Sequence, residues 1–242
     1  MKKINLLLVP IAFVCLTAAC SGSASVNKSI KIEAGATSDG GSTVNGKVSV
    51  GPGAVVRGDL ETVNGSISIA ENVQAGAVES VNGRIQIDRG ADIASSETVN
   101  GRNSIGPDSR VAGDVSTVNG LISVGSGSEV GGDISAVNGK IRLNNVMVNG
   151  NVENINGGME LKDGTRVAQS VIVRKPKSSG WSWGKKDKNK KPRIVIGRDV
   201  VIEGDLVLEQ EVELYVHETA KIGAIVAEAI EVDMMRFSGD SP

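Results

Sequence analysis

A Val-Asn-Gly triplet returns along this chain every 18 or 19 residues. Six copies begin with a valine and a seventh with an isoleucine, at Val44, Val63, Val81, Val99, Val118, Val137 and Ile155. A period of this length is typical of repeat architectures, in which one unit cannot bury its apolar face without a neighbour. Most of the chain is therefore expected to form one elongated solenoid.

Aliphatic residues also recur every six positions, without a slip from Val63 to Val111 and again from Ile196 to Val226. Three sixes make one coil of 18 residues, so a coil with three flat faces, each a short strand, explains both spacings. Val, Ile and Thr dominate the expected strands, and Gly, Asn and Asp lie between them, where turns form. The expected fold class is all-β, a single-chain parallel β-solenoid over residues 43–237 with about 18–19 residues per coil.

Parallel stacking of the coils would place the triplet asparagines above one another at the strand spacing of about 4.8 Å. Each side-chain amide would then be satisfied by its neighbours above and below. The alternative is that each Asn-Gly forms a type I′ hairpin turn in an antiparallel meander. The predicted structural ladder comprises Asn45, Asn64, Asn82, Asn100, Asn119, Asn138 and Asn156.

Gly-Asp pairs form a second recurring corner, at Gly58-Asp59, Gly113-Asp114, Gly132-Asp133 and Gly204-Asp205. A column of aspartates could suggest calcium, but the chain contains neither an Asp-x-Asp loop nor the Gly-Gly-x-Gly-x-Asp nonapeptide. We therefore expect turn residues on a solvated corner, with no metal site and no cofactor.

The N-terminus has the pattern of an export signal. Lys2 and Lys3 precede an apolar stretch, residues 6–16, that is too short to span a bilayer. Residues 16–20, Leu-Thr-Ala-Ala-Cys, resemble a bacterial lipobox, although Thr17 replaces the usual leucine. The resemblance implies cleavage of residues 1–19 and lipid attachment at Cys20. An ordinary secretory signal is the alternative.

The residue after the cysteine and the segment that follows complete this interpretation. By resemblance to lipoprotein sorting patterns, Ser21 favours the outer membrane of a bacterial cell envelope over the inner one. The membrane is then an expected partner of the protein, which is held there by the N-terminal lipid. Residues 20–42 are rich in Ser, Gly and Ala, and we expect a flexible tether there, with one possible strand at 29–33.

Residues 48–60, VSVGPGAVVRGDL, and 105–115, IGPDSRVAGDV, resemble bactofilins, bacterial polymer-forming cytoskeletal proteins. The Thr-Val-Asn-Gly motif also resembles adhesin-like exported proteins, and uncharacterised proteobacterial proteins built from such repeats. The likeness covers roughly residues 43–237. It implies a right-handed helix and end-to-end polymerisation, and it carries over no catalytic residue.

One segment interrupts the six-residue spacing, RKPKSSGWSWGKKDKNKKPR at 174–193. It holds nine basic residues and one acidic residue, whereas the rest of the chain after residue 19 carries a net charge of about −12. A concentrated basic loop on an acidic body is typical of binding to an anionic partner. Tryptophan prefers the membrane interface and also stacks on sugars. The candidate binding residues are Trp181, Trp183, Lys185, Lys186, Lys188, Lys190 and Lys191.

This loop predicts contact with lipid headgroups, lipopolysaccharide phosphates or peptidoglycan, and the alternative is a solvated loop without a partner. Nucleic acid is not expected as a partner, because an exported protein is separated from the nucleic acid of the cell. His217, the one histidine, is expected on the surface of a strand rather than in a catalytic site. We expect no enzyme activity, since the chain shows no nucleophile-base pair and no metal-ligand cluster.

The two ends of the solenoid decide between two functions. Apolar residues at 232–237 are expected to cover the last coil, ahead of a polar tail at 238–242. If the ends stay open, the protein is expected to be a scaffold that self-associates through them. If both ends are covered, the protein is expected to be a monomeric rod. The alternative function is a binding module that presents the basic loop to an envelope polymer.

Overall fold

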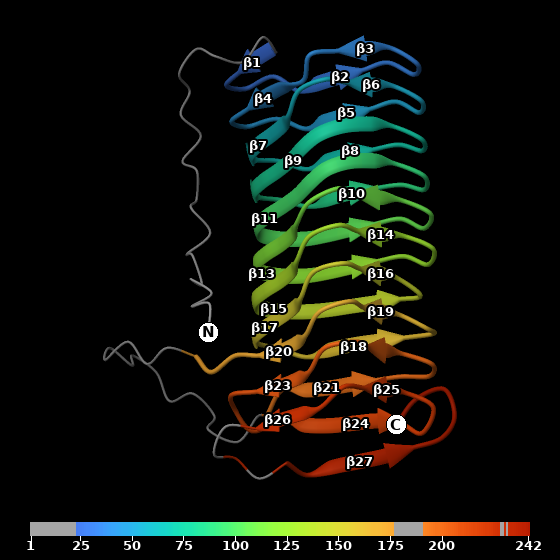
Figure 1. Ribbon diagram of the computed structural model, residues 1–242. Helices are drawn as coiled ribbons and strands as arrows, with labels where there is room; N and C mark the ends of the chain where they lie inside the picture. Colours follow the sequence, from blue (N-terminus) through green and yellow to red (C-terminus); the bar gives the residue numbers. More distant parts are fainter. Residues whose placement is uncertain (1–22, 177–190, 228–229, 231) are drawn as a thin grey trace, which may run out of the picture.

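The structure, a computed structural model, describes residues 23–176, 191–227, 230 and 232–242. These residues form a parallel β-solenoid of about ten turns, and no helix occurs among them (Figure 1). The coils stack in chain order, with the first at one end of the rod and the last at the other. The predicted fold class is confirmed.

Three strands make one coil, and they define three faces of the rod. The first face contains β1 (Ser23–Ser25), β4 (Gly41–Thr43), β7 (Leu60–Asn64), β9 (Gln74–Asn82), β11 (Asp92–Ile105), β13 (Val115–Val124), β15 (Ile134–Asn144), β17 (Val152–Asn156), β20 (Val171–Val173), β23 (Leu206–Leu208) and β26 (Ile225–Ala227). The long strands β9, β13 and β15 each bend around one corner onto a neighbouring face, and β11 rounds two corners and contributes to all three faces.

The second face adds β2 (Ile30–Ile32), β5 (Val48–Val50), β8 (Ile67–Ile69), β10 (Ile85–Ile87), β18 (Met159–Lys162), β21 (Arg193–Ile196), β24 (Glu213–His217) and β27 (Met234–Phe237). The third face adds β3 (Thr37–Ser38), β6 (Val55–Val56), β12 (Arg110–Val111), β14 (Glu129–Val130), β16 (Met147–Val148), β19 (Arg166–Val167), β22 (Val201–Ile202) and β25 (Lys221–Ile222).

All strand pairings among the described residues are parallel, so the antiparallel hairpin alternative is wrong. The register aligns equivalent positions of the repeat. Asn100 of β11, for example, lies beside Asn82 of β9 on one side and Asn119 of β13 on the other. The extra residue of the 19-residue copies is absorbed at the corners, where it does not disturb the strands.

Inward-facing aliphatic side chains fill a narrow core. Along β8 and β10 the buried positions alternate with outward ones, as extended strands require. Several polar residues are also buried among the described residues; Asn103, for example, accepts from the Ser96 hydroxyl at 2.9 Å and donates to the Ser96 carbonyl at 3.0 Å. The described core runs from Ile32 to Val216, so a chain beginning at residue 21 contains all of it.

The corner between the second and third faces needs a left-handed residue in almost every coil. A positive φ is costly for residues with a Cβ, and glycine, asparagine and aspartate tolerate it best. Only these three residue types occupy the position. They are Gly35, Gly53, Asn72, Gly90, Asp108, Gly127, Asn145, Asp163, Gly164 and Asp199.

The solenoid begins earlier than the sequence suggested. Strands β1, β2 and β3 form a complete first coil that pairs with β4, β5 and β6, so residues 23–42 are not a tether. A segment of small polar residues is usually flexible, but here its backbone groups form hydrogen bonds with the next coil along the chain. The sequence signal that was missed is Val26-Asn27, which lies 18 residues before Val44-Asn45 and is therefore an earlier copy of the repeat.

The C-terminal segment also differs from the expectation. Ile230 and Val232 pack against the core, but Met234–Phe237 form β27, which pairs with β24 as a further rung. This strand extends the sheet and leaves its own edge open. These residues therefore cover β24, but they leave the final edge of the solenoid open, where a cap was expected.

Candidate functional surfaces

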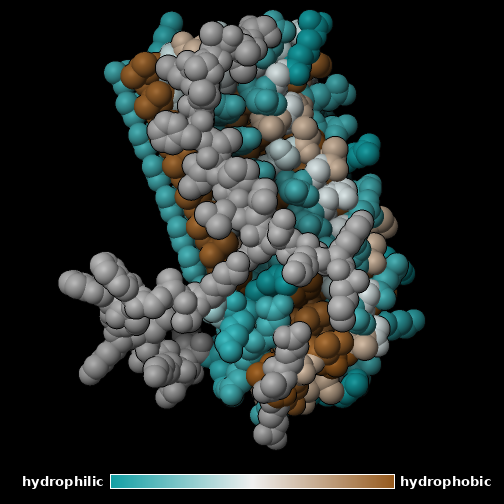
Figure 2. All heavy atoms as spheres, turned by 60° about the vertical axis from the view of Figure 1, so that its left-hand side comes forward, coloured by the Kyte–Doolittle hydropathy of each residue, from teal (hydrophilic) through white to brown (hydrophobic). Residues whose placement is uncertain are grey.

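The predicted asparagine ladder is formed at the corner between the first and second faces. Each Nδ2 donates to the Oδ1 of the asparagine one coil earlier, at distances of 2.8 to 3.0 Å. An eighth member, Asn27, accepts from Asn45 at 2.9 Å and lies in a copy that lacks the glycine. Figure 2 shows a hydrophilic column along one edge of the rod, directly beside a hydrophobic column.

The glycines of the triplet are required by close backbone approach. A Cβ at Gly101 would overlap the carbonyl oxygen of Gly83, and the same holds from coil to coil along the column. In several coils the residue two positions before the asparagine donates its hydroxyl to the carbonyl of the triplet glycine one coil earlier. Thr62, for example, donates to the Gly46 carbonyl at 3.0 Å. The Thr-Val-Asn-Gly motif is thus explained by stacking, which gives it a structural role.

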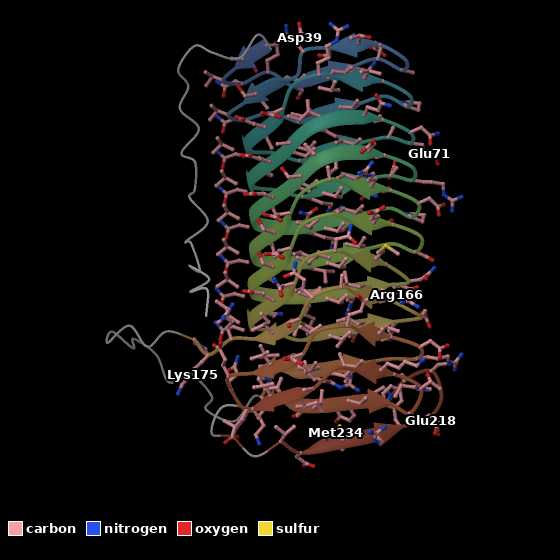
Figure 3. The ribbon with its side chains drawn as sticks, in the orientation of Figure 1. Asp39, Glu71, Arg166, Lys175, Glu218 and Met234 are labelled. Atoms are coloured by element: carbon pink, nitrogen blue, oxygen red, sulfur yellow. The ribbon has the colours of Figure 1, made fainter. Side chains whose placement is uncertain are left out.

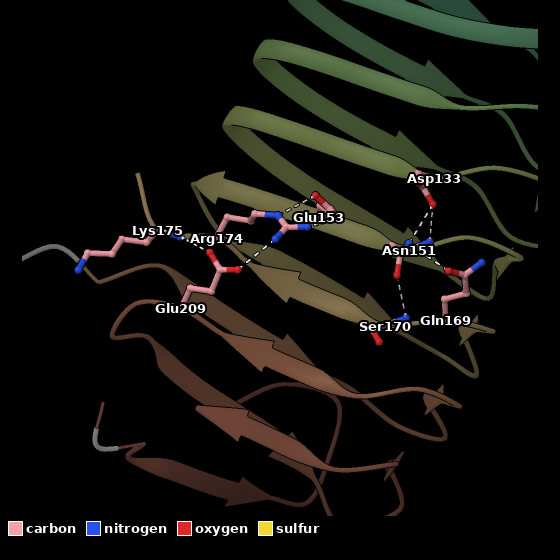
Figure 4. Close-up of polar contacts among 8 residues, drawn as sticks. All are labelled: Asp133, Asn151, Glu153, Gln169, Ser170, Arg174, Lys175 and Glu209. Atoms are coloured by element: carbon pink, nitrogen blue, oxygen red, sulfur yellow. Dashed lines mark hydrogen bonds and ion pairs between the residues drawn. The ribbon is translucent and has the colours of Figure 1, made fainter. Parts of the chain in front are cut away.

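The aspartate corner is also structural. Asp59 accepts the backbone N–H of Ala77 at 2.8 Å, and Asp114 accepts that of Asp133 at 2.8 Å, each from the following coil. Asp133 continues the column by accepting the N–H of Asn151 at 2.7 Å (Figure 4). No group of three metal-ligating side chains is found among the described residues.

Three glutamates stack on the outer side of the first face, at equivalent positions of successive coils. Glu61 pairs in register with Glu79, and Glu79 with Glu97. Partial burial and the neighbouring carboxylates raise the pKa of Glu79 to about 7. Burial, together with Asp59 and Asp114 respectively, also raises the pKa values of Glu61 and Glu97. This acidic column was not identified from the sequence, although the repeat register would have revealed it.

The basic insertion leaves the rod at a well-fixed point. Arg174 makes a two-pronged contact with Glu153, at 2.9 and 3.1 Å, and a further bond of 3.0 Å to Glu209 (Figure 4). The side-chain amide of Gln210 donates to the carbonyls of Ile155 and Arg174, at 2.6 and 2.7 Å. These contacts secure the corner at which the asparagine ladder ends.

The other side of the insertion returns to the same coils. Lys191 pairs with Glu211 at 3.0 Å, and the Arg193 guanidinium lies 4.8 Å from the centre of the Tyr215 ring. Of the candidate binding residues, only Lys191 is described, and it is engaged by the rod. Trp181, Trp183, Lys185, Lys186, Lys188 and Lys190 lie outside the described residues, as does Cys20.

His217 is buried, contrary to the expected surface position. Its exposed fraction is 3%, its Nδ1 lies 3.0 Å from the Thr219 hydroxyl, and its ring meets Phe237 edge-on with centroids 5.1 Å apart. The covering strand β27 causes this burial. Packing between these rings gives His217 a structural role.

Both ends of the solenoid present strand edges. Within the described chain, β1, β2 and β3 pair on one side only, and so do β25, β26 and β27 at the other end. Figure 3 shows Asp39 near the first end and Met234 near the last. Four apolar side chains are partly exposed at the last coil, Ile225 (40%), Val226 (41%), Met234 (37%) and Met235 (38%).

A shallow depression on the third face is lined by Val55, Gln74 and Asp92, beside small residues such as Gly76. It brings together no nucleophile and general base. No helix in the described ranges is long and apolar enough to cross a membrane. Comparisons with protein-family models, with curated proteins and with solved structures gave no match to this chain.

Proposed function

We propose that this protein is a non-enzymatic, lipid-anchored scaffold of the bacterial cell envelope that self-associates through the ends of its solenoid. The open strand edges at both ends are the observation that carries the proposal. Unpaired edges are templates for pairing with another chain, and soluble proteins normally block them. The resemblance of residues 48–60 to bactofilins points in the same direction.

The two ends are compatible with continuous stacking. At the last coil, β26 ends the first face and β27 ends the second. At the first coil, β1 begins the first face and β2 begins the second. A second copy could therefore continue both sheets in parallel, and its first coil would cover the inward-facing Ile225 and Met234.

The experiment places a charge at these inward positions. Ile225→Lys/Met234→Lys would bury two ammonium groups in the junction, which is strongly unfavourable. In about 0.5 M salt, where exposed charges are strongly screened, sedimentation velocity of residues 21–242 should show oligomers that lengthen with concentration, and monomers for the double variant. The control is Val55→Lys/Met147→Lys, which introduces the same two charges at side positions that are 37% and 48% exposed. Equal behaviour of the double variant and the control would refute stacking through the ends.

The second candidate function is a binding module that holds an anionic envelope polymer through the insertion. Its support is the charge of the segment and the rigid base that Arg174 and Lys191 give it. Deleting residues 177–190 keeps both of these contacts. Loss of salt-dependent binding to anionic vesicles or to isolated peptidoglycan would support this function, and unchanged binding would refute it.

The location of the protein at a membrane is part of the same proposal. Lipid attachment at Cys20 would tether every copy to a membrane by its N-terminus, with a short link to the first coil at Ser23. Mass spectrometry of the protein from a bacterial membrane fraction tests it. An unmodified Cys20, or a chain that still begins at Met1, would contradict the proposal.

A further inference from the structure

The sides of the rod carry segregated charge. On the first face, the outward positions hold the acidic column and the aspartates of the adjoining corner, namely Asp39, Asp59, Glu61, Glu79, Glu97, Asp114 and Asp133. On the second face, the outward position just after the asparagine corner holds Lys47, Arg84, Arg102 and Lys140. We call these rows the acidic row and the basic row.

The members of the basic row are exposed, and none of them takes part in an ion pair with another described residue. The outward positions beside them are neutral from Ser49 to Ser123. Arg84 and Arg102 precede the paired residues Ile85 and Asn103, so they stack directly above one another. The acidic row likewise has no ion-pair partner among the described residues. Each row is thus unneutralised on its own rod.

The two rows are level with each other. In four coils an acidic residue of the first face is followed shortly by a basic residue of the second face. The pairs are Asp39 and Lys47, Glu79 and Arg84, Glu97 and Arg102, and Asp133 and Lys140. Since all coils repeat at the same strand spacing, two copies placed side by side at the same height would bring opposite charges together at all four levels.

We propose that a second copy of this chain docks laterally, its basic row against the acidic row of the first copy. Charge complementarity of this kind steers association and fixes register. The contact joins different faces of the two copies, so it is heterologous and can continue from rod to rod. It uses the sides of the solenoid and does not depend on stacking through the ends.

Two further features fit this contact. Burial and then the neighbouring carboxylates raise the pKa of Glu79 on the isolated rod, and an opposing row of cations would offset the repulsion from those carboxylates. The partly buried valines beside the acidic column, such as Val81 and Val99, add an apolar strip to a flat surface. Flatness and a fixed repeat allow many weak contacts to act together.

The test uses residues 21–242 carrying Ile225→Lys/Met234→Lys, so that end stacking is disabled and only lateral contacts are measured. Sedimentation should show oligomers at low ionic strength that dissociate at about 0.5 M salt, where screening is nearly complete within a few ångströms. Glu79→Lys/Glu97→Lys and Arg84→Glu/Arg102→Glu should each weaken self-association at least tenfold. Arg110→Glu/Arg166→Glu, with the same charge change on the third face, should leave it unchanged.

Mixing the two weakened variants provides the decisive result. Each variant retains one native row, and the two reversed rows are complementary to each other, so an equimolar mixture should regain the salt-sensitive oligomers that each variant alone has lost. Monomers of the parent at low salt, or a mixture that stays monomeric, would overturn the proposal. If a charge-reversal variant fails to fold, the neutral pair Glu79→Gln/Glu97→Gln and Arg84→Gln/Arg102→Gln replaces it, with the same expected loss of association.

Discussion

Replacing Gly101 by alanine should reveal how tightly the coils are held together. The new Cβ would overlap the backbone carbonyl oxygen of Gly83, and a backbone atom cannot move aside as a flexible side chain can. The two coils must therefore separate at this corner. Three hydrogen bonds cross the junction, Gly83 N–H to Asn100 O at 3.0 Å, Asn100 to Asn82 at 2.9 Å, and Thr98 to Gly83 at 3.4 Å.

Each such bond contributes about 1 kcal/mol net, so their combined loss predicts a destabilisation of about 3 kcal/mol. Gly53→Ala is the matched control. Gly53 has a φ of +67° and open space around it, so its substitution introduces only backbone strain, about 1–2 kcal/mol. Urea denaturation followed by circular dichroism measures both variants. If Gly101→Ala is no more harmful than Gly53→Ala, the corner spacing can relax and the stacking argument is wrong.

Three other predictions concern the ladder, the acidic column and the base of the insertion. Asn100→Ala removes two ladder bonds and Asn156→Ala one, so their losses in unfolding free energy should stand near two to one. A raised carboxyl pKa means that the folded state binds the proton more tightly, so stability should fall as pH rises from about 4.5 to about 7. Glu79→Gln should remove part of this pH dependence of the unfolding free energy. The variant should be about 1 kcal/mol more stable than the parent at pH 8, after allowance for solvent screening, and urea unfolding from pH 4.5 to pH 8 measures the difference. Arg174→Ala leaves two largely buried carboxylates, Glu153 and Glu209, unpaired and should destabilise by about 3 kcal/mol. Lys175→Ala, whose side chain points away from the rod (Figures 3 and 4), should change the urea midpoint little.

Much of the fold follows from the sequence, because spacing alone fixes which residues become neighbours in a parallel coil. The 18- and 19-residue steps predicted the asparagine ladder, and the structure confirms it for all seven predicted asparagines. The six-residue spacing placed the insertion at 174–193, and the structure has it between β20 and β21, with Arg193 already the first residue of β21. Local composition was less informative, since Ser23–Thr43 looks flexible until its backbone is paired with the next coil.

Other features depend on contacts that no repeat spacing encodes. His217 is buried because Phe237 of β27, the next rung of the sheet, packs edge-on against its ring. The fixed position of Arg174 depends on Glu153 and Glu209, which are 21 and 35 residues away in the chain. The segregated charge rows, in contrast, are encoded in the repeat register, and they become visible once the outward positions of each face are aligned coil by coil.

Electron microscopy of negatively stained residues 21–242, with sedimentation of the same sample, tests the scaffold proposal most directly. Our account predicts assemblies that lengthen along the solenoid axis through the ends, and that thicken at low salt through the charged sides. Discrete single rods at every concentration and salt would contradict self-association. They would leave the basic insertion as the feature to investigate.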